Sequence, residues 1–158
     1  MEIRFASPAD VPGIIALLRQ VGQVHHRGRP DIFRADAQKY APSQVLAMLD
    51  KGETPIFVAV EDGAVLGYCF CQIHTYYRDT VITDHTDCYI DDLCVDKDAQ
   101  RKGVGKALYQ AVCQYAKQRK CRAVTLNVWC CNEKAMEFYV NLGMKPQKIG
   151  METILEDD

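Results

Sequence analysis

Two glycines and three basic residues lie within seven positions, in the stretch Gln-Arg-Lys-Gly-Val-Gly-Lys at residues 100–106. From Val104 onward, apolar residues recur in steps of three and one, which predicts one face of an α-helix. Gly103 and Gly105 therefore stand at a helix start, where backbone N–H groups lack intrahelical partners and a ligand can approach the main chain closely. Those amides, the positive end of the helix dipole and the basic side chains favour an anion. The stretch predicts a phosphate or diphosphate site.

Two common phosphate-binding motifs do not fit this stretch. A dinucleotide fingerprint needs a third glycine, but Leu108 stands there. A P-loop needs glycine and serine or threonine where the chain has Gln100 and Ala107. A nucleotide-binding regulator is therefore kept only as an alternative. What remains is Gln-x-x-Gly-x-Gly after an apolar segment that ends Leu-Cys-Val.

Two adjacent acids, Asp91 and Asp92, interrupt that apolar segment, residues 88–95. The segment has the β-branched and aromatic composition of a strand. Acids inside a strand are costly unless they are paired or solvated. Because successive side chains of a strand alternate, the two carboxylates are expected to face opposite sides of the sheet. Each is a candidate for binding a cationic group, and the alternative is an ion pair with arginine or lysine or a solvated position.

The first motif resembles the acetyl-CoA motif of the GNAT superfamily of N-acetyltransferases, Arg/Gln-x-x-Gly-x-Gly/Ala, with matches at Gln100, Gly103 and Gly105. A second stretch resembles the family's C-terminal pattern, Asn-x-x-Ala-x-x-Phe-Tyr-x-x-x-Gly-Phe. Its matches are Asn132, Ala135, Phe138, Tyr139 and Gly143, and Met144 replaces the last phenylalanine. The acids and the following Leu-Cys-Val are similar to a Glu-Asp pair in diamine acetyltransferases.

The resemblance implies transfer of an acetyl group from acetyl-CoA, as co-substrate, to a primary amine by direct attack in a ternary complex. No metal is implied. Tyr139 would be the general acid, because a phenol with a pKa near 10 is protonated at neutral pH, and Asp91 would bind or help deprotonate the amine. The residues implied to bind the cofactor, those before Gln100 through their main chain, are Leu93, Cys94, Val95, Gln100, Arg101, Lys102, Gly103, Val104, Gly105, Lys106, Asn132, Ala135 and Phe138.

The acceptor side is less sharply defined. Weaker candidates for substrate binding are Asp92, Phe33, Tyr76 and Trp129, and Arg27, Arg29 and Tyr40 are candidates for lining a pocket. The acid pair favours a small cationic amine as acceptor. The alternatives are a peptide or protein amine, or a non-catalytic acyl-CoA-binding module that would not need Tyr139. Cys94 is not favoured as a nucleophile, because no histidine stands in a supporting position.

The elements that must position these residues follow from periodicity and punctuation. Ser7, Pro8 and Asp10 predict a helix start, Asp62-Gly63 predicts a hairpin, and Asn132 is a predicted helix N-cap. The expected order is β-α-α-β-β-β-α-β-α-β, with strands at residues 2–5, 55–60, 64–76, 88–95, 123–128 and 145–155. This is the order of the GNAT fold, an α/β (α+β) mixed sheet, mainly antiparallel and splayed between the fourth and fifth strands. One domain over residues 1–158 is expected.

Composition limits the other classes of function. The chain has 158 residues, a net charge of −2 and no apolar run long enough for a membrane span. Neither a nucleic-acid partner nor a membrane is expected, and a homodimer is left open. The eight cysteines lack Cys-x-x-Cys spacing, so reduced thiols are expected. The strand-like N-terminus does not have the pattern of a signal peptide, which favours a cytoplasmic location.

Overall fold

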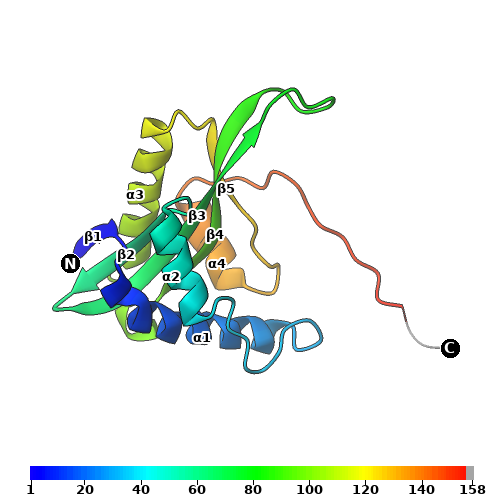
Figure 1. Cartoon of the computed structure of the whole chain (residues 1–158). Coiled ribbons are helices and arrows are strands. Elements are labelled where there is room, and N and C mark those ends of the chain that lie inside the picture. Colours follow the sequence, from blue (N-terminus) through cyan, green and yellow to red (C-terminus); the bar gives the residue numbers. More distant parts are fainter. Residues whose placement is uncertain (156–158) are drawn as a thin grey trace. The chain divides into compact units, whose positions relative to one another are not determined.

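The computed structural model describes residues 1–155 and places them in two compact units, residues 1–127 and 128–155. The elements are β1 (Glu2–Phe5), a 3-10 turn (Pro8–Asp10), α1 (Val11–Gly28), α2 (Pro42–Lys51), β2 (Ile56–Glu61), β3 (Ala64–Tyr76), β4 (His85–Val95), a second 3-10 turn (Lys97–Ala99), α3 (Val104–Gln118), β5 (Ala123–Leu126) and α4 (Glu133–Asn141) (Figure 1).

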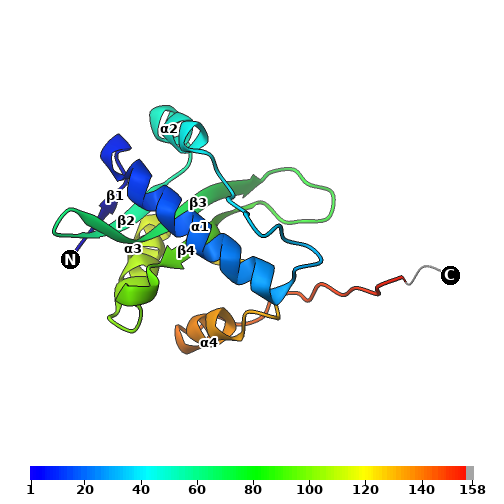
Figure 2. The ribbon, with the colours of Figure 1, turned by 90° about the horizontal axis from the view of Figure 1, so that it is seen from below.

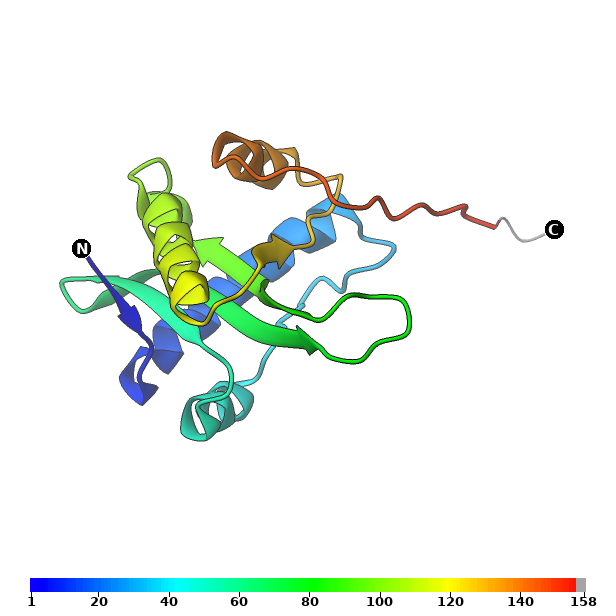
Figure 3. The same ribbon diagram turned by 90° about the horizontal axis from the view of Figure 1, so that it is seen from above.

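The first unit is built on one five-stranded sheet in the order β1-β2-β3-β4-β5. The first four strands are antiparallel neighbours, and β4 pairs with β5 in parallel. Asp62 and Gly63 close the β2–β3 hairpin with positive φ angles of 50° and 79°. The mixed sheet and its order confirm the expected fold over these elements. The long β3–β4 hairpin extends beyond the sheet (Figure 3).

Helices cover both faces of this sheet. On one face, α1 and α2 pack against β3 through a core that includes Ile14, Leu18, Val45 and Phe70, here named the α1-side core. On the other face α3 packs through Val104, Leu108, Val112 and Ala116, together with alternate residues of β2, β3 and β4, here named the α3-side core. Figure 2 shows α1 crossing the sheet on the face opposite α3.

Gly67 of β3 lets α3 pack closely against the sheet. A Cβ added to Gly67 would lie 2.9 Å from the carbonyl oxygen of Cys94 and 3.1 Å from Cδ1 of Leu108. Any side chain at Gly67 would therefore push on β4, whose main chain at Leu93 to Val95 is predicted to bind the cofactor, and on the first turns of α3.

The second unit holds α4 and an extended tail. Asn132 caps α4, as predicted, because its side-chain oxygen accepts a hydrogen bond from the Ala135 N–H at 3.2 Å. The predicted last strand, residues 145–155, was wrong: within the described residues this segment has no strand. Apolar alternation alone does not make a strand, because its backbone groups need a partner edge, and Pro146 and Gly150 weaken the segment further.

Candidate active site

The pairing of β4 with β5 ends before β4 does. The parallel ladder runs from Asp87 opposite Ala123 to Ile90 opposite Leu126, and β4 then continues for five residues to Val95. On its other side β4 stays paired with β3 as far as Val95 opposite Gly67. Among residues 1–127, the edge of β4 that faces β5 is thus unpaired from Asp91 to Val95. This is the splay predicted from the sequence, and it leaves backbone groups of Leu93 to Val95 available to an extended ligand.

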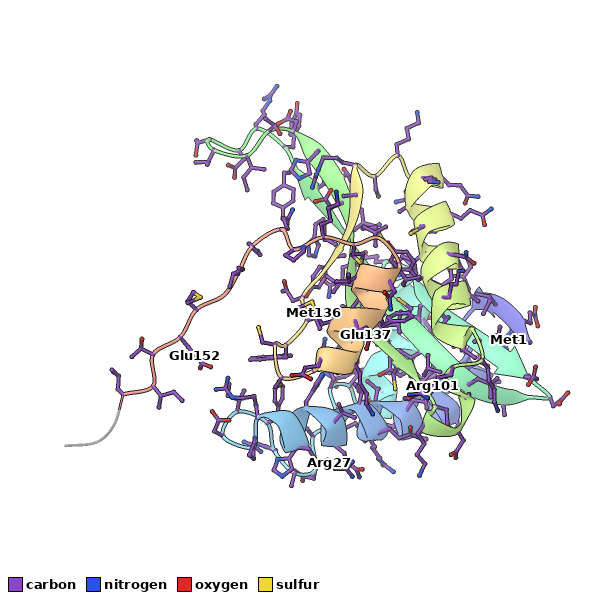
Figure 4. All side chains as sticks on the ribbon, turned by 180° about the vertical axis from the view of Figure 1, so that it is seen from behind. Met1, Arg27, Arg101, Met136, Glu137 and Glu152 are labelled. Carbon is purple, nitrogen blue, oxygen red and sulfur yellow. The ribbon has the colours of Figure 1, made fainter. Side chains whose placement is uncertain are left out.

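A turn with two left-handed residues leads from β4 to α3. Arg101 has φ 62° and Gly103 has φ 82°, and a Cβ at Gly103 would meet nothing within 4 Å. Four residues of the turn are exposed, as is Lys106, whereas Val104 is buried and Gly105 half-buried. Arg101 is labelled in Figure 4. The first amides of α3 therefore open towards solvent beside basic side chains, the arrangement that binds anions.

Gln100 is exposed, and its side chain also makes a hydrogen bond within the protein. Its side-chain Nε2 donates to the carbonyl oxygen of Val95 at 3.4 Å. This hydrogen bond ties the turn back to the end of β4. The motif glutamine thus helps to hold the turn against the strand that precedes it.

A β-bulge places both acids on one face of the sheet. Phe70 pairs with Asp92 and Cys71 pairs with Ile90, so Asp91 is an extra residue in β4 with no counterpart in β3. Ile90 belongs to the α3-side core, but Asp92 is bonded to Tyr68 of the α1-side core. The expectation that the two carboxylates face opposite sides was wrong, because the extra residue resets the alternation.

Asp91 is held by the segment that joins α1 to α2. Lys39 Nζ lies 3.0 Å from Oδ1 of Asp91 and donates to its backbone carbonyl at 2.9 Å. The Tyr40 hydroxyl donates to Oδ2 at 2.5 Å. Burial and the bond to Asp91 raise the pKa of Tyr40, so this phenol stays protonated. Tyr40 was a sequence candidate, whereas Lys39 was missed, since nothing near it in the sequence signals its contact with β4.

Asp92 has a different environment. Its Oδ2 accepts a hydrogen bond from the Tyr68 hydroxyl at 3.0 Å, and the main-chain N–H of Leu93 also contacts the carboxylate. Burial raises the pKa of Asp92 to about 6, against the opposing effects of Lys39 and Tyr68. A carboxyl group with such a pKa is largely ionised at neutral pH and can still accept a proton.

Cys94 is a buried thiol. It is 8% exposed, and its sulfur contacts the Leu17 carbonyl at 3.6 Å. Burial raises the pKa of Cys94 to about 12, so little thiolate exists at neutral pH. Within the described part of the chain, all eight cysteines are free. The same residues hold no cluster of three or more His, Cys, Asp or Glu side chains arranged to bind a metal.

The other predicted acceptor residues of the first unit make aromatic stacking contacts. Phe33 stacks on His25 with ring centroids 4.9 Å apart, in the same connecting segment as Lys39. Tyr76 ends β3 and stacks on His85 at 4.7 Å. Phe70 of β3 pairs with Asp92, and Tyr76 lies six residues further along β3. The structure therefore brings together the acids, the open edge and the basic turn, but not Tyr76.

The remaining candidates belong to the second unit. Tyr139 is half-buried on α4 and its ring makes a T-shaped contact with Phe138 at 5.1 Å. Ala135 and Phe138 are half-buried on the same helix, and Trp129, 41% exposed, precedes it. Figure 4 labels two neighbours on α4, Met136 and Glu137. The roles of these residues stay predictions.

Comparisons with known proteins agree with this geometry. The model of the acetyltransferase (GNAT) family matches residues 23–144. An uncharacterized N-acetyltransferase of Bacillus subtilis is 29% identical over 143 residues, which cover 90% of this chain and 89% of that protein. One of Methanocaldococcus jannaschii is 29% identical over 75% of this chain, and the chain spans about half of its length, 51%.

Two further similarities extend over most of the chain. A thialysine N-epsilon-acetyltransferase of Bos taurus is 23% identical over 89% of this chain and 82% of its own. The crystal structure of a mutant protein from Bacillus halodurans superposes with a TM-score of 0.94 at 30% identity, covering 99% of this chain and all of that one. None of the helices in residues 1–155 is long and apolar enough to cross a membrane.

The family match spans well over half of the chain and includes the open edge of β4, the acid pair, the basic turn and Tyr139. The chain belongs to the GNAT family of acetyltransferases, a class of acyl-CoA-dependent transferases.

Proposed function

We propose that this chain is a cytoplasmic enzyme that transfers the acetyl group of acetyl-CoA to the primary amine of a small cationic acceptor. Residues 1–158 would act as one catalytic domain, and the amine would attack the thioester directly in a ternary complex. The observation that carries the proposal is that three features follow one another in residues 91–106. They are an open strand edge, a basic turn with two residues in the left-handed conformation, and a helix start. Free thiols at all eight cysteines fit a reducing compartment.

The cofactor would lie along this strand, turn and helix. Main-chain groups of Leu93 to Val95 would pair with the pantetheine arm as a further strand does. The diphosphate would bind the amides and basic side chains of the turn and the first turn of α3, residues 100–106. In the second unit, Asn132, Ala135 and Phe138 are proposed to contact the arm.

The chemistry would need three groups. Asp92 would accept the proton of the acceptor ammonium, directly or through water, since its pKa of about 6 suits a base near neutral pH. The free amine would then attack the thioester carbon, and main-chain N–H groups at the open edge of β4 that are not bonded to Asp92 would stabilise the oxyanion. As the tetrahedral intermediate collapses, the carbon–sulfur bond breaks and Tyr139 would give its phenolic proton to the thiolate of CoA. The attacking nitrogen, which became positively charged on attack, would lose its proton through water to the resulting phenolate and leave a neutral amide. A buried, protonated Cys94 argues against an acetyl-cysteine intermediate.

Asp91 would bind and position rather than accept the proton. Both of its carboxylate oxygens already have protein partners, Lys39 and Tyr40. Two carboxylates against one lysine still leave a negative site, which supports a cationic acceptor. The similarity to a thialysine acetyltransferase points to the same class of amine. Phe33, Tyr76 and Trp129 remain weaker proposals for acceptor contacts. A peptide amine is the second candidate acceptor.

The function is tested by calorimetry with acetyl-CoA and by thiol release with a panel of small amines and amine-bearing peptides. We expect acetyl-CoA to bind, and turnover with a small amine to fall sharply in Tyr139→Phe. That variant removes the proton and keeps the ring. Binding without turnover on any amine would instead indicate a non-catalytic acyl-CoA-binding module, and full turnover in Tyr139→Phe would remove the proposed acid.

A further inference from the structure

A cationic side chain lies beside the acid pair. The segment between α1 and α2 crosses the same face of the sheet and places the Lys39 ammonium 3.0 Å from Oδ1 of Asp91. The Asp91 side chain is 12% exposed and that of Lys39 is 42% exposed. An ammonium has three donors, and the contacts with Asp91 use two of them. A fixed positive charge thus stands at the mouth of the negative site.

Lys39 is held in place by its neighbours on both sides. Before it, Gln38 accepts a hydrogen bond from Arg19 Nε on α1 at 2.9 Å and donates to the carbonyl oxygen of Tyr40 at 2.9 Å. After it, Tyr40 packs its ring on Phe70 at 5.3 Å while its hydroxyl binds Asp91. The backbone around Lys39 is therefore anchored to both α1 and the sheet, unlike that of a typical surface lysine.

The segment between α1 and α2, residues 29–41, has a small net positive charge that comes from Lys39, because Arg29 and Arg34 are balanced by Asp31 and Asp36. With the last turn of α1 included, residues 25–41 contain four basic residues and two acidic ones, the histidines being neutral, and Arg29 is paired with Asp31 at 2.7 Å. Burial and nearby Lys39 lower the pKa of His25, which keeps that ring uncharged. Arg27, at the end of α1, is exposed and is labelled in Figure 4. A second ammonium on the acceptor would face the Lys39 ammonium and be repelled by it, whereas a carboxylate would be attracted to it.

We propose that the acceptor carries an amino-acid head group, with its carboxylate bound by Lys39 and its ammonium by the Asp91 side of the pair. This rests on the proposed function and narrows its substrate class. The opposite charges of the protein are 3.0 Å apart, so a ligand that engages both must carry its own opposite charges only a few bonds apart. An ammonium and a carboxylate on one carbon meet that condition, but a diamine of similar length does not.

The test compares matched acceptors with the full chain. Glycine, γ-aminobutyrate and lysine are each assayed against the corresponding carboxamide, and lysine also against cadaverine, with kcat/KM obtained from thiol release. The amide keeps the amine and the size but removes the negative charge. We expect at least one acid to exceed its amide by roughly tenfold or more, the usual value of a charge-assisted contact.

Lys39→Met then asks whether this preference belongs to Lys39. We expect the ratio of acid to amide to fall to about one in Lys39→Met and to be largely kept in Lys39→Arg. Lys51→Met, which alters an exposed lysine at the end of α2, should leave the ratio unchanged. Because the readout is a ratio within one variant, a general loss of activity does not imitate the result. Should Lys39→Met not fold, Lys39→Gln is measured in its place.

The outcomes separate the two proposals. Turnover of amines with no preference for the carboxylate, or a preference that survives Lys39→Met, overturns the head-group proposal alone. Acetyl-CoA binding with no turnover on any amine or peptide overturns the proposed function, and the head-group proposal falls with it.

Discussion

Asp10 and Asp92 are two carboxylates of the same unit that the fold treats in opposite ways. Asp10 receives a bidentate contact from Arg4, at 2.8 and 2.9 Å, and bonds from the Ser7 N–H and hydroxyl. The hydrogen bond from Arg4, with those from Ser7, lowers the pKa of Asp10 to about 2 despite burial. Burial raises the pKa of Asp92 to about 6. The first is held as an anion, and the second can gain or lose a proton near neutral pH.

The difference teaches how to tell a structural acid from a functional one. Asp10 closes the turn that starts α1, so its charge is matched by partners that stabilise the fold. Asp92 is bonded by a neutral phenol and a backbone amide, with the nearest cation placed on Asp91 instead. A carboxylate that is buried without a matched charge costs stability, and such a cost is most often kept where function needs it.

The largest expected effect is on turnover. Asp92→Asn removes the proton acceptor and keeps an oxygen for the Tyr68 hydroxyl, so kcat should fall by roughly 100-fold or more, a typical value for a lost general base. Thiol release at saturating acetyl-CoA measures this. Near-normal kcat in the folded variant would show that Asp92 is not the base.

Asp10→Asn should give the opposite result. The salt bridge to Arg4 is lost, and the free energy of unfolding at pH 7.5 should fall by about 2 kcal/mol, the value that corresponds to the lowered pKa of Asp10. Urea titration measures the loss, and kcat per folded molecule should be unchanged. In the same titration Asp92→Asn should be no less stable than the parent chain, because it removes a buried charge. If both variants lose stability equally, the contrast between the two acids is wrong.

The pH dependence follows from the same two shifts. The raised pKa of Asp92 means that the folded state holds this proton more tightly than the unfolded chain does. Its contribution to stability is therefore greatest below the ordinary pKa near 4 and declines as pH rises to about 6. The lowered pKa of Asp10 works in the other direction, and its contribution is lost as pH falls from about 4 to about 2.

For activity, kcat/KM should decrease below about pH 6, tenfold per pH unit, as Asp92 becomes protonated. Asp91→Asn serves as the control, because it removes the neighbouring carboxylate but leaves Asp92 in place to titrate. A profile that is flat between pH 5 and pH 7 would separate Asp92 from the chemistry.

The parts of the structure that depend on local chemistry could be predicted from the sequence. The helix start at Ser7 and Pro8, the N-cap Asn132, the Asp62-Gly63 turn and the helix start after Gly103 all form where their residue types predict. Short-range geometry of this kind depends on a few neighbouring residues. The Gln-x-x-Gly-x-Gly turn was therefore assigned correctly to the start of a helix after a strand.

The rest depends on contacts between distant residues. The bulge at Asp91 contains no glycine, and the apolar pattern of β4 on its own fits a regular strand, so only its pairing with β3 reveals the extra residue. Lys39 binds Asp91 across 52 positions of sequence, and no local pattern signals that contact. The predicted strand at residues 145–155 had the right composition, but composition cannot supply a pairing edge.

The smallest effect should come from a substitution in α1. Asp10 precedes α1, and Gly22 near its other end lies against the segment that carries Lys39: an added Cβ would be 2.0 Å from the Ala37 carbonyl oxygen. Gly22→Ala must therefore move that segment, since backbone atoms cannot yield as a flexible side chain does. We expect KM for the acceptor to rise by a few-fold, of the order that lost positioning of one charged group costs, with KM for acetyl-CoA unchanged. Gly52→Ala, at a glycine with open space around it but φ 66°, is the matched control for a general loss of stability. If Gly22→Ala altered both KM values equally, or neither, the segment around Lys39 would not be part of the acceptor site. The functional contrast between Asp92 and Asp10 would then not depend on that segment.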